Sequence, residues 1–307
     1  LGGSAYSIMP EAVLEAVGAD YGVVGEGERI MVEFAADAER GVYPGQRIIR
    51  AASQLCGSMI PRASYDPAML TYYLQNANIV SVQTKRGCTH NCVYCSYPSL
   101  EGSSIRCREP REVVDDVEFL AQERGAKMIF FIDSVFNDDA GHYRDVLQEM
   151  KRRGVCVPWT AFIKPEQLDD ETVLLMKDTG LKAVELGSDA PSDATLEGLG
   201  KSFRFRDVAA CTDLFARHDI ATAHYFMFGC PGETQASVHE GINNIVNLKK
   251  TVSFIFMGIR ILPATALEAV AVRDGVIVPG QDLFDPVYYI APGIDREWLE
   301  RVLTAGF

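Results

Sequence analysis

The chain has 307 residues, of which 48% are hydrophobic and 23% are charged, and its formal net charge is −13. This composition is typical of a soluble globular protein, and the acidic balance argues against nucleic acid as a partner, because phosphates require a basic surface. No apolar stretch approaches the ~20 residues that span a bilayer, and no charged-then-apolar leader opens the chain. A cytoplasmic protein without a transmembrane segment is therefore expected.

Residues 1–40 show the pattern of two βα units. LGGSAYS is expected to be the remnant of a strand and YGVVGEGE a short strand with a glycine-rich turn, and helical spacing follows each of them. Two such units are too few for a stable doubly wound sheet, so the segment is predicted to be the C-terminal half of a larger domain. Residues 41–78 contain several prolines and no sustained period, and are predicted to be a connector.

The most informative stretch begins at residue 79, where a β-branched apolar run leads into a polar loop. This loop places Cys88, Cys92 and Cys95 at CxxxCxxC spacing. Thiolates are soft ligands that suit iron–sulfur chemistry, and three of them on one loop can hold three irons of a four-iron cluster. The fourth iron is then open, and an open iron can chelate the amino and carboxylate groups of S-adenosylmethionine (SAM).

Two other interpretations of these cysteines stay open. A structural zinc site normally has four ligands, usually as two separated pairs, and the sequence has no second CxxC pair. A ferredoxin-like electron carrier would need a fourth thiolate. His90 or Cys107 would have to supply the missing ligand. The remaining cysteines are scattered and do not look like a disulfide framework; they are expected to be small buried hydrophobic residues, with Cys230 as the exception because of its neighbours.

From residue 79 onward, predicted strands and helices alternate. The strand candidates are 79–86, 128–134, 159–164, 183–187, 221–228 and 253–261. Amphipathic helices are predicted near 110–124, 139–153, 167–178, 204–217 and 235–249. Regular alternation implies parallel strands with helices outside, joined by right-handed crossovers. This is an α/β fold whose six units make an incomplete (β/α)6 barrel, with an active site expected at the carboxyl ends of its strands.

The cysteine spacing, with Tyr94 directly before the last cysteine, resembles that of the radical SAM superfamily. The resemblance implies a 4Fe-4S cluster held by Cys88, Cys92 and Cys95, with Tyr94 beside the cofactor. It also implies reductive cleavage of SAM to a 5′-deoxyadenosyl radical. An external electron donor such as flavodoxin or ferredoxin would then supply the electron.

The resemblance further assigns residues after the second and fourth strands to SAM. Asp133 and Ser134 would contact the SAM amino group, although an aspartate at this place also suits a helix cap. Gly187 and Asp189 match the family segment that meets the ribose hydroxyls, with Ala190 in place of a common serine.

Two more charged residues belong to this fourth-strand segment. Glu185 lies inside the strand and is expected to face the barrel lumen or a structural partner, since charged residues are seldom buried without a reason. Lys201 would offset the SAM carboxylate, or would simply be solvated, which is the commoner fate of a lysine.

The fifth strand ends in MFGCPGET, which matches the family's GxPGE-type turn. In that turn, which is formed here by Gly229, Pro231, Gly232 and Glu233, glycines bring the backbone close to the adenine. His224 within the strand is expected to be a satisfied core or lumen residue rather than a ligand.

Arg260 follows among the apolar residues of the sixth strand. Burying it alone would be expensive, so it is expected to point to an anion at the barrel mouth, either a cofactor carboxylate or substrate. The LPATAL segment after it resembles the PGTxL segment that closes these barrels, with Ala264 in place of the usual glycine.

The stretch LGGSAYSIMPEAVLEAVGADYGVVGEGE resembles the C-terminal half of the cobalamin-binding domain that precedes many radical SAM barrels. In that family, glycine turns at the strand ends let the backbone approach the corrinoid and its nucleotide tail. The corresponding positions here are Gly2, Gly3, Ser4, Gly25, Glu26 and Gly27. A glycine after a strand also commonly just makes a turn.

These assignments give a predicted domain organisation. The ranges are 1–40 for a partial cobalamin-binding domain, 41–78 for a connector, 79–267 for the radical SAM barrel and 268–307 for a C-terminal extension.

Three hypotheses for the function follow. The first is a cobalamin-dependent methyltransferase that acts on an unactivated carbon. The second is a cyclase or rearranging enzyme of pigment or lipid biosynthesis that uses the same barrel without net methyl transfer. The third is a non-catalytic iron–sulfur or zinc binding module.

Aromatic residues accumulate at the last two strands and in the C-terminal loop. They are Phe226, Phe228, Phe254, Phe256, Phe284, Tyr288 and Tyr289. Period-two geometry turns half of the strand members toward the lumen, which favours a lipid-like or other hydrophobic small-molecule substrate. The alternative is that these rings only pack strands against helices.

Overall fold

The computed structural model describes residues 1–307, which fall into two compact units. The loop unit comprises Leu1–Cys56, Gly87–Ile105 and Arg260–Tyr289. The sheet unit comprises Gly57–Arg86, Arg106–Ile259 and Ile290–Phe307. Each unit is assembled from separate segments, whereas the domains predicted from the sequence are consecutive ranges.

The sheet unit is built on six parallel strands. These are β3 (Ile79–Val82), β6 (Met128–Phe131), β7 (Trp159–Ile163), β8 (Ala183–Asp189), β9 (Ala221–Phe228) and β10 (Thr251–Met257). Their spatial order, β10-β9-β8-β7-β6-β3, repeats the chain order, as successive right-handed crossovers produce. The prediction of an α/β fold with six parallel strands is confirmed.

The predicted bounds of five strands differ from the observed ones: β7 is one residue shorter than predicted, β8 is two residues longer, and the other three were too long or displaced. The first strand stops at Val82, and after a turn β4 (Lys85–Arg86) pairs antiparallel with β5 (Arg106–Cys107). The second strand stops at Phe131, before the polar residues of its loop. The last begins at Thr251 and is interrupted at Gly258, whose φ of 79° breaks the extended backbone before β11 (Ile259–Arg260).

All five predicted helices of this region exist. They are α6 (Pro110–Glu118), which continues as the π-helix η2 (Phe119–Glu123), α7 (His142–Arg153), α8 (Asp170–Asp178), α10 (Phe205–Arg217) and α11 (Gln235–Val246). The sheet unit also contains the 3-10 turn η1 (Gly57–Met59) and the helix α13 (Arg296–Gly306).

Two further helices were not predicted. α9 (Asp193–Gly198) is too short to display a period, although Ser192 accepts the Thr195 N–H as its cap. α4 (Pro67–Asn76) lies within the predicted connector and buries only Leu70, so it shows no apolar stripe. The sequence signal for α4 lies at its N-terminus, where Asp66 caps the helix and a proline follows at the first position.

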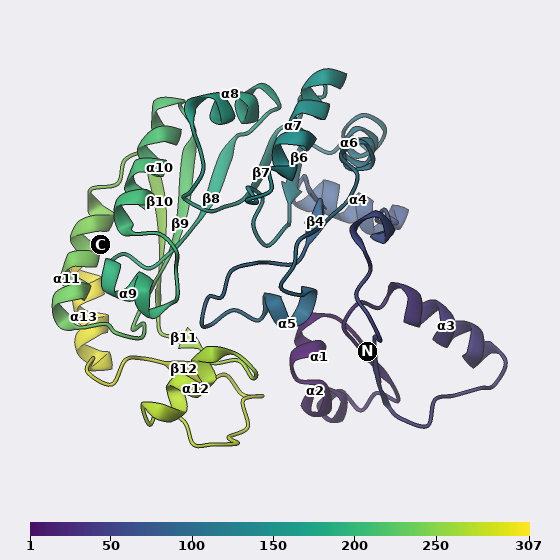
Figure 1. Cartoon of the computed structure of the whole chain (residues 1–307), viewed down its shortest axis with the longest axis horizontal. Helices are drawn as coiled ribbons and strands as arrows, with labels where there is room; N and C mark the ends of the chain where they lie inside the picture. The colour runs from purple at the N-terminus through teal and green to yellow at the C-terminus, as the bar shows by residue number, and fades with distance from the viewer. The chain divides into compact units, whose positions relative to one another are not determined.

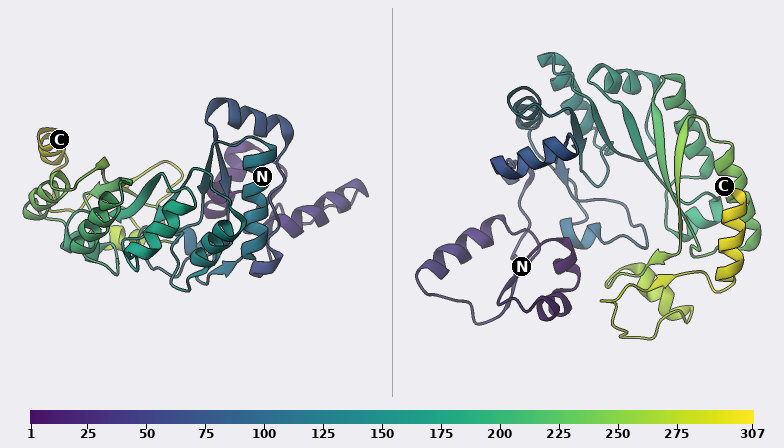
Figure 2. Two further views of the ribbon diagram at one scale, coloured as in Figure 1. Left: turned by 90° about the horizontal axis from the view of Figure 1, so that it is seen from above. Right: turned by 180° about the vertical axis from the view of Figure 1, so that it is seen from behind.

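Helices cover one face of the six-stranded sheet (Figures 1 and 2). On this face β8 buries Val184, Leu186 and Ser188, and the alternating residues of β9 are equally buried. The core includes an aromatic cluster in which the ring of Phe131 lies 4.9 Å from Phe136 and 5.4 Å from Trp159. Burial of alternate residues leaves the other members of each strand on the opposite face.

His224 is one of the residues on the helix-covered face, as expected. Its side chain is fully buried and lies 2.7 Å from the Ser188 Oγ and 3.2 Å from the Thr222 Oγ1. Burial lowers the pKa of His224 to about 4, so the ring is neutral and belongs to the core.

The loop unit begins with residues that pair with its first strand. The Leu1 amine donates to the Tyr21 carbonyl at 2.7 Å, and the Val23 N–H donates to the Leu1 carbonyl at 2.8 Å. The predicted strand remnant is wrong for this segment: residues 1–3 form no strand beyond these two hydrogen bonds of Leu1, and helix α1 begins at Ser4. No helix of the chain is both long and apolar enough to cross a membrane.

The remaining elements of this unit are short. They are α1 (Ser4–Ile8), α2 (Pro10–Val17), β1 (Gly22–Val24), α3 (Glu28–Glu39), β2 (Ile48–Arg50), α5 (Tyr97–Glu101), α12 (Ala266–Arg273) and β12 (Tyr288–Tyr289). β1 and β2 are parallel, and Gly22 in β1 is required because a Cβ there would lie 2.2 Å from the buried ring of Tyr6.

A buried ion cluster anchors the chain where β4 begins. The Lys85 ammonium is 2% exposed and lies 3.2 Å from the Asp133 carboxylate and 3.3 Å from that of Asp138. It also donates to the Phe136 carbonyl at 2.8 Å. Burial alone would raise the pKa of Asp138, but the Lys85 charge and backbone N–H donors outweigh it, and this pKa is lowered.

A second buried carboxylate holds the turn after β9. One oxygen of Glu233 accepts the N–H groups of Gly229 and Cys230, the latter at 3.0 Å, while the other oxygen is buried without a partner. Burial raises the pKa of Glu233 to about 7, although the two N–H donors oppose this shift.

Lys85→Met is expected to lower the free energy of unfolding by about 3–5 kcal/mol, because it leaves two buried carboxylates without their cation. The matched control is Lys151→Met, which breaks an exposed 2.8 Å pair with Asp178. That control should cost no more than about 1 kcal/mol. Urea unfolding of both variants measures the difference, and equal midpoints would contradict the role given to Lys85.

Glu233→Gln is expected to remove part of the pH dependence of stability. In the folded chain the pKa of Glu233 is raised from 4.5 to about 7. The contribution of the protonated carboxyl to the free energy of unfolding is therefore complete below pH 4.5 and is lost as the pH rises to about 7. Over this window the loss is about 3 kcal/mol. Glutamine cannot ionise but still accepts a hydrogen bond. Urea unfolding between pH 4.5 and 8 should show a flatter profile for this variant, whereas the exposed control Glu240→Gln should follow the original protein.

Candidate cofactor and substrate sites

The three cysteines of the CxxxCxxC motif lie in a loop between β4 and α5. Gly87 starts this loop with φ 92°, and a Cβ at this position would lie 2.1 Å from the Ser104 carbonyl oxygen. The Cys88 N–H donates to the Gly102 carbonyl at 3.1 Å and closes the base of the loop. Only glycine fits the first position, so the loop geometry depends on it.

None of the three cysteines is in a disulfide. Cys88 is buried, Cys92 and Cys95 are half-buried, and the Cys95 N–H donates to the Cys92 carbonyl at 3.1 Å. Tyr94 between them is also half-buried. No group of three or more His, Cys, Asp or Glu side chains is gathered as a site for a single metal ion. Three soft donors on one constrained loop fit the ligation of an iron–sulfur cluster.

The strand-end residues predicted for SAM belong to the sheet unit. Asp189 ends β8 with φ 57°, a conformation that is uncommon for residues other than glycine, and its carboxylate forms an ion pair with Lys201. The structure therefore brings these two predicted residues together. Gly187 shares the half-exposed face of β8 with Asp189 and Glu185, and Glu185 accepts a hydrogen bond from the Tyr225 hydroxyl at 3.0 Å.

The turn after β9 is shaped by two glycines. Gly229 has φ 89° and Gly232 has φ 81°. Pro231 between them packs against α9, since a Cβ on Gly198 would lie 1.9 Å from the Pro231 carbonyl oxygen. Together with the Glu233 carboxylate, these contacts fix the backbone of the turn and leave Gly232 exposed.

The Asp133 carboxylate, which was predicted to contact SAM, is already bound to other residues of the chain. It is buried and accepts hydrogen bonds from the Thr84 N–H at 2.7 Å and the Thr84 hydroxyl at 2.6 Å, in addition to its contact with Lys85. The half-buried Ser134 follows it. The Nε of Arg260 is buried and has no hydrogen-bond partner in the chain.

The predicted cobalamin-binding residues lie in two segments of the loop unit that are linked by a backbone hydrogen bond from the Val23 N–H of β1 to the Leu1 carbonyl. Gly2, Gly3 and Ser4 follow Leu1, and Gly25, Glu26 and Gly27 follow β1. Gly3 has φ 93° with nothing near its Cβ position. Glu26 accepts the Leu55 N–H at 2.6 Å. The carboxyl end of a strand is where doubly wound sheets bind ligands, so the segment after β1 and the open backbone at Gly3 fit a cofactor.

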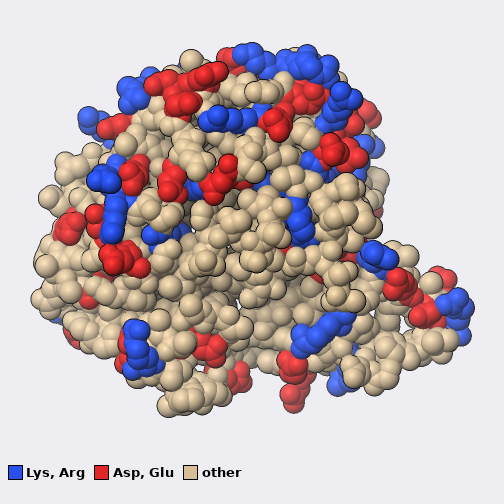
Figure 3. Space-filling model, viewed as in Figure 1, with Lys and Arg blue, Asp and Glu red and all other residues tan.

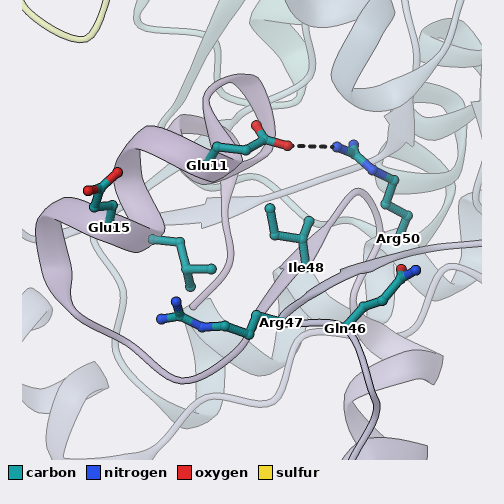
Figure 4. A pocket seen from close by; sticks show the side chains of 7 residues that line it. Glu11, Glu15, Gln46, Arg47, Ile48 and Arg50 are labelled. Atoms are coloured by element: carbon teal, nitrogen blue, oxygen red, sulfur yellow. Dashed lines mark hydrogen bonds and ion pairs between the residues drawn. The ribbon is translucent and has the colours of Figure 1, made fainter.

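A separate pocket of about 650 Å³ lies in the loop unit between α2 and β2 (Figure 4). Its lining is Glu11, Leu14, Glu15, Gln46, Arg47, Ile48 and Arg50. Glu11 and Arg50 point toward each other at 3.5 Å. None of the predicted glycine-segment residues lines this pocket, so it does not coincide with the predicted cobalamin site.

Sequence reasoning missed three residues that shape these sites. Lys85 and Asp138 complete the buried ion cluster, and Tyr225 binds Glu185. A lysine three residues after the end of an apolar strand was the only available signal for the first.

On the face shown in Figure 3, basic and acidic side chains alternate over the helices without a single-sign patch.

A comparison with protein families matches residues 82–244 to the radical SAM superfamily. Among curated proteins, tryptophan 2-C-methyltransferase of Streptomyces laurentii is 24% identical in an alignment of 343 positions that covers 87% of this chain and 57% of that protein. The anaerobic magnesium-protoporphyrin IX monomethyl ester cyclase of Rubrivivax gelatinosus is 22% identical and covers 75% of this chain and 45% of its own length. The chain thus spans about half the length of these relatives.

The solved structure of the radical SAM methyltransferase TsrM from Kitasatospora setae, with tryptophan substrate and a SAM analogue bound, is similar with a TM-score of 0.85. Its sequence identity is 25%, over 100% of this chain and 70% of that one. A second structure of TsrM, with cobalamin and a [4Fe-4S] cluster bound, gives a TM-score of 0.77 and 26% identity over 96% of this chain and 64% of that one. The family match covers more than half of the sequence and includes the cysteine loop, and this chain therefore belongs to the radical SAM superfamily.

Proposed function

We propose that this chain is the core of a cobalamin-dependent radical SAM methyltransferase that acts on an unactivated carbon of a hydrophobic small molecule. The observation that carries the proposal is the constrained loop with three cysteines outside any disulfide and no fourth cysteine in the motif. Its similarity to TsrM, which has been solved with cobalamin and a [4Fe-4S] cluster, supports the choice of cofactors.

The residues would divide the work as follows. Cys88, Cys92 and Cys95 hold the 4Fe-4S cluster, which supplies one electron to SAM when bound, and Tyr94 packs beside it. Asp189 binds the ribose hydroxyls of SAM, and its ion pair with Lys201 holds the carboxylate in its strained backbone position.

Backbone groups and smaller polar residues complete the proposed SAM contacts. Gly187, Gly229, Pro231 and Gly232 supply close backbone approach at the ends of two strands. Ser134 contacts the amino group, and Arg260 meets an anion through its unpaired Nε.

Asp133 and Glu185 are assigned more indirect roles. The Asp133 carboxylate is occupied by Thr84 and Lys85, so we assign it to holding this strand end in place. Glu185 lies deeper in its strand than Gly187 and already accepts the Tyr225 hydroxyl.

The N-terminal glycine segments would hold cobalamin. Gly2, Gly3, Ser4, Gly25 and Gly27 are exposed or half-buried, and Glu26 stabilises the segment after β1 through Leu55. An external donor of the flavodoxin or ferredoxin type would reduce the cluster. The eight free cysteines favour a reducing compartment such as the cytoplasm.

A second candidate function is a cyclase or rearranging enzyme without net methyl transfer. It is favoured by the similarity to the anaerobic magnesium-protoporphyrin IX monomethyl ester cyclase, although that relative is more distant than the methyltransferases. The fate of the SAM methyl group separates the two functions.

Replacing Cys88, Cys92 or Cys95 with alanine is expected to abolish cluster binding and methyl transfer, because three irons each need one thiolate. Chemical iron and sulfide analysis after anaerobic reconstitution measures the first effect. Transfer of label from methyl-labelled SAM, with cobalamin and a reductant, measures the second across a set of candidate substrates.

The matched control is Cys156→Ala, which removes an exposed thiol outside the motif and should leave both readouts unchanged. Full iron content and full transfer in the three motif variants would rule the proposal out. Product that forms without the label would favour the cyclase.

A further inference from the structure

The face of the six-stranded sheet opposite the helices described above carries exposed aromatic rings. Phe162 in β7 is 38% exposed, and Phe254 and Phe256 in β10 are 45% and 48% exposed. Phe226 and Phe228, which were expected among the apolar residues near the lumen, lie on the helix-covered face and are fully buried. Exposed rings gathered on one sheet face are unusual unless something covers them.

The strand register places these rings around one carboxylate. Phe162 is opposite Glu185, Glu185 is opposite Ala223, and Tyr225 is opposite Phe254. The Tyr225 ring stacks on that of Phe254 at 5.1 Å with an interplanar angle of 12°. The Tyr225 hydroxyl donates to Oε2 of Glu185 at 3.0 Å. The stacking and the hydrogen bond therefore hold the Tyr225 side chain in one orientation.

The second oxygen of this carboxylate is available. Oε1 of Glu185 accepts no hydrogen bond within the chain. Among the residues of the six strands, Glu185 and Asp189 are the acidic side chains, and there is no lysine or arginine. Asp189 is neutralised by Lys201, so the strand residues of the aromatic face present one uncompensated acceptor and no cationic side chain.

Glu185 lies further from the carboxyl end of β8 than the positions proposed for SAM. It precedes Gly187 by two residues and Asp189 by four, which is roughly 7 Å and 13 Å at about 3.3 Å per residue. On β9, Tyr225 directly precedes Phe226, which is the pairing partner of Asp189. A ring bound at Glu185 would therefore adjoin the SAM positions, on the side away from the strand ends.

We propose that Glu185, Tyr225 and Phe254 form a substrate subsite that selects a planar aromatic group carrying an N–H donor. The ring would stack on the Phe254 and Tyr225 side, and its N–H would donate to Oε1 of Glu185. The inference rests on the proposed function, because it assumes that the barrel face receives the substrate, and it narrows the hydrophobic substrate to one class.

The same groups also determine which ligands the subsite binds poorly. A carboxylate without a basic neighbour repels fatty acids and other anions whose charge would fall at this point. An aromatic hydrocarbon of equal size keeps the stacking but leaves the Glu185 oxygen without a donor. A higher affinity for a ring with an N–H donor than for an aromatic hydrocarbon of equal size is therefore the property that identifies this site.

The test measures binding of indole and of naphthalene to the cluster-loaded chain by calorimetry, with indole-3-carboxylate as the anionic probe. We expect indole to bind more tightly than either of the others. Glu185→Gln should weaken indole about tenfold, the effect of one charge-assisted hydrogen bond, and should leave naphthalene within twofold. Phe254→Ala should weaken both rings, because each loses the same stacking surface.

Glu197→Gln, on the exposed surface of α9, is the matched control and should change nothing. Equal loss of indole and naphthalene in Glu185→Gln, or unchanged binding in Phe254→Ala, would overturn the proposal. The adenine of SAM is also a ring with N–H groups, so the titration is repeated with saturating SAM. Displacement of indole by SAM would assign these residues to the SAM site and overturn the subsite, whereas simultaneous binding supports it.

The binding readout needs no turnover. Failure of indole discrimination therefore sinks the subsite even if SAM-dependent methyl transfer is found. Conversely, discrimination by Glu185 stands even if the label of the SAM methyl group never reaches a product.

Discussion

The parallel arrangement of the six strands is the constraint on which the sites of the sheet unit depend. Every right-handed crossover returns the chain to the same edge, so the carboxyl ends of β6, β8 and β9 lie together although they are far apart in sequence. The period of two then divides each strand between a helix-covered core and a face that is free to bind ligands. Asp189, Gly187 and Glu185 share one face of β8 for this reason alone.

Buried charge is used in this fold to hold loops rather than to stabilise the core. The Lys85 cluster ties the start of β4 to the loop after β6, and Glu233 gathers the N–H groups of the turn after β9. Such groups are costly to desolvate and gain little over apolar packing, so their value lies in the specific geometry they impose. Both stand at strand ends, where the backbone must keep an irregular course.

Much of this was predictable from local pattern. β9 was predicted with its observed bounds, because its run of eight residues ends at the glycine-containing turn. The cysteine spacing indicated the family that the family comparison then showed. The partners of Lys85 were not predictable, because Asp133 lies 48 residues away and only strand register brings the two together. The Tyr225–Glu185 bond has the same cause. α9 was not predicted because it is too short to show a helical period, and α4 was not predicted because it buries only Leu70.

The central claim is that the loop of Cys88, Cys92 and Cys95 leaves one iron of a four-iron cluster open to SAM. Electron paramagnetic resonance of the reduced, reconstituted protein tests it most directly, with spectra recorded before and after addition of SAM. Direct chelation of the open iron predicts a clear change in the g-values and line shape of the cluster signal. An intact cluster whose spectrum is the same in saturating SAM would show that all four irons are already ligated, and would contradict the account.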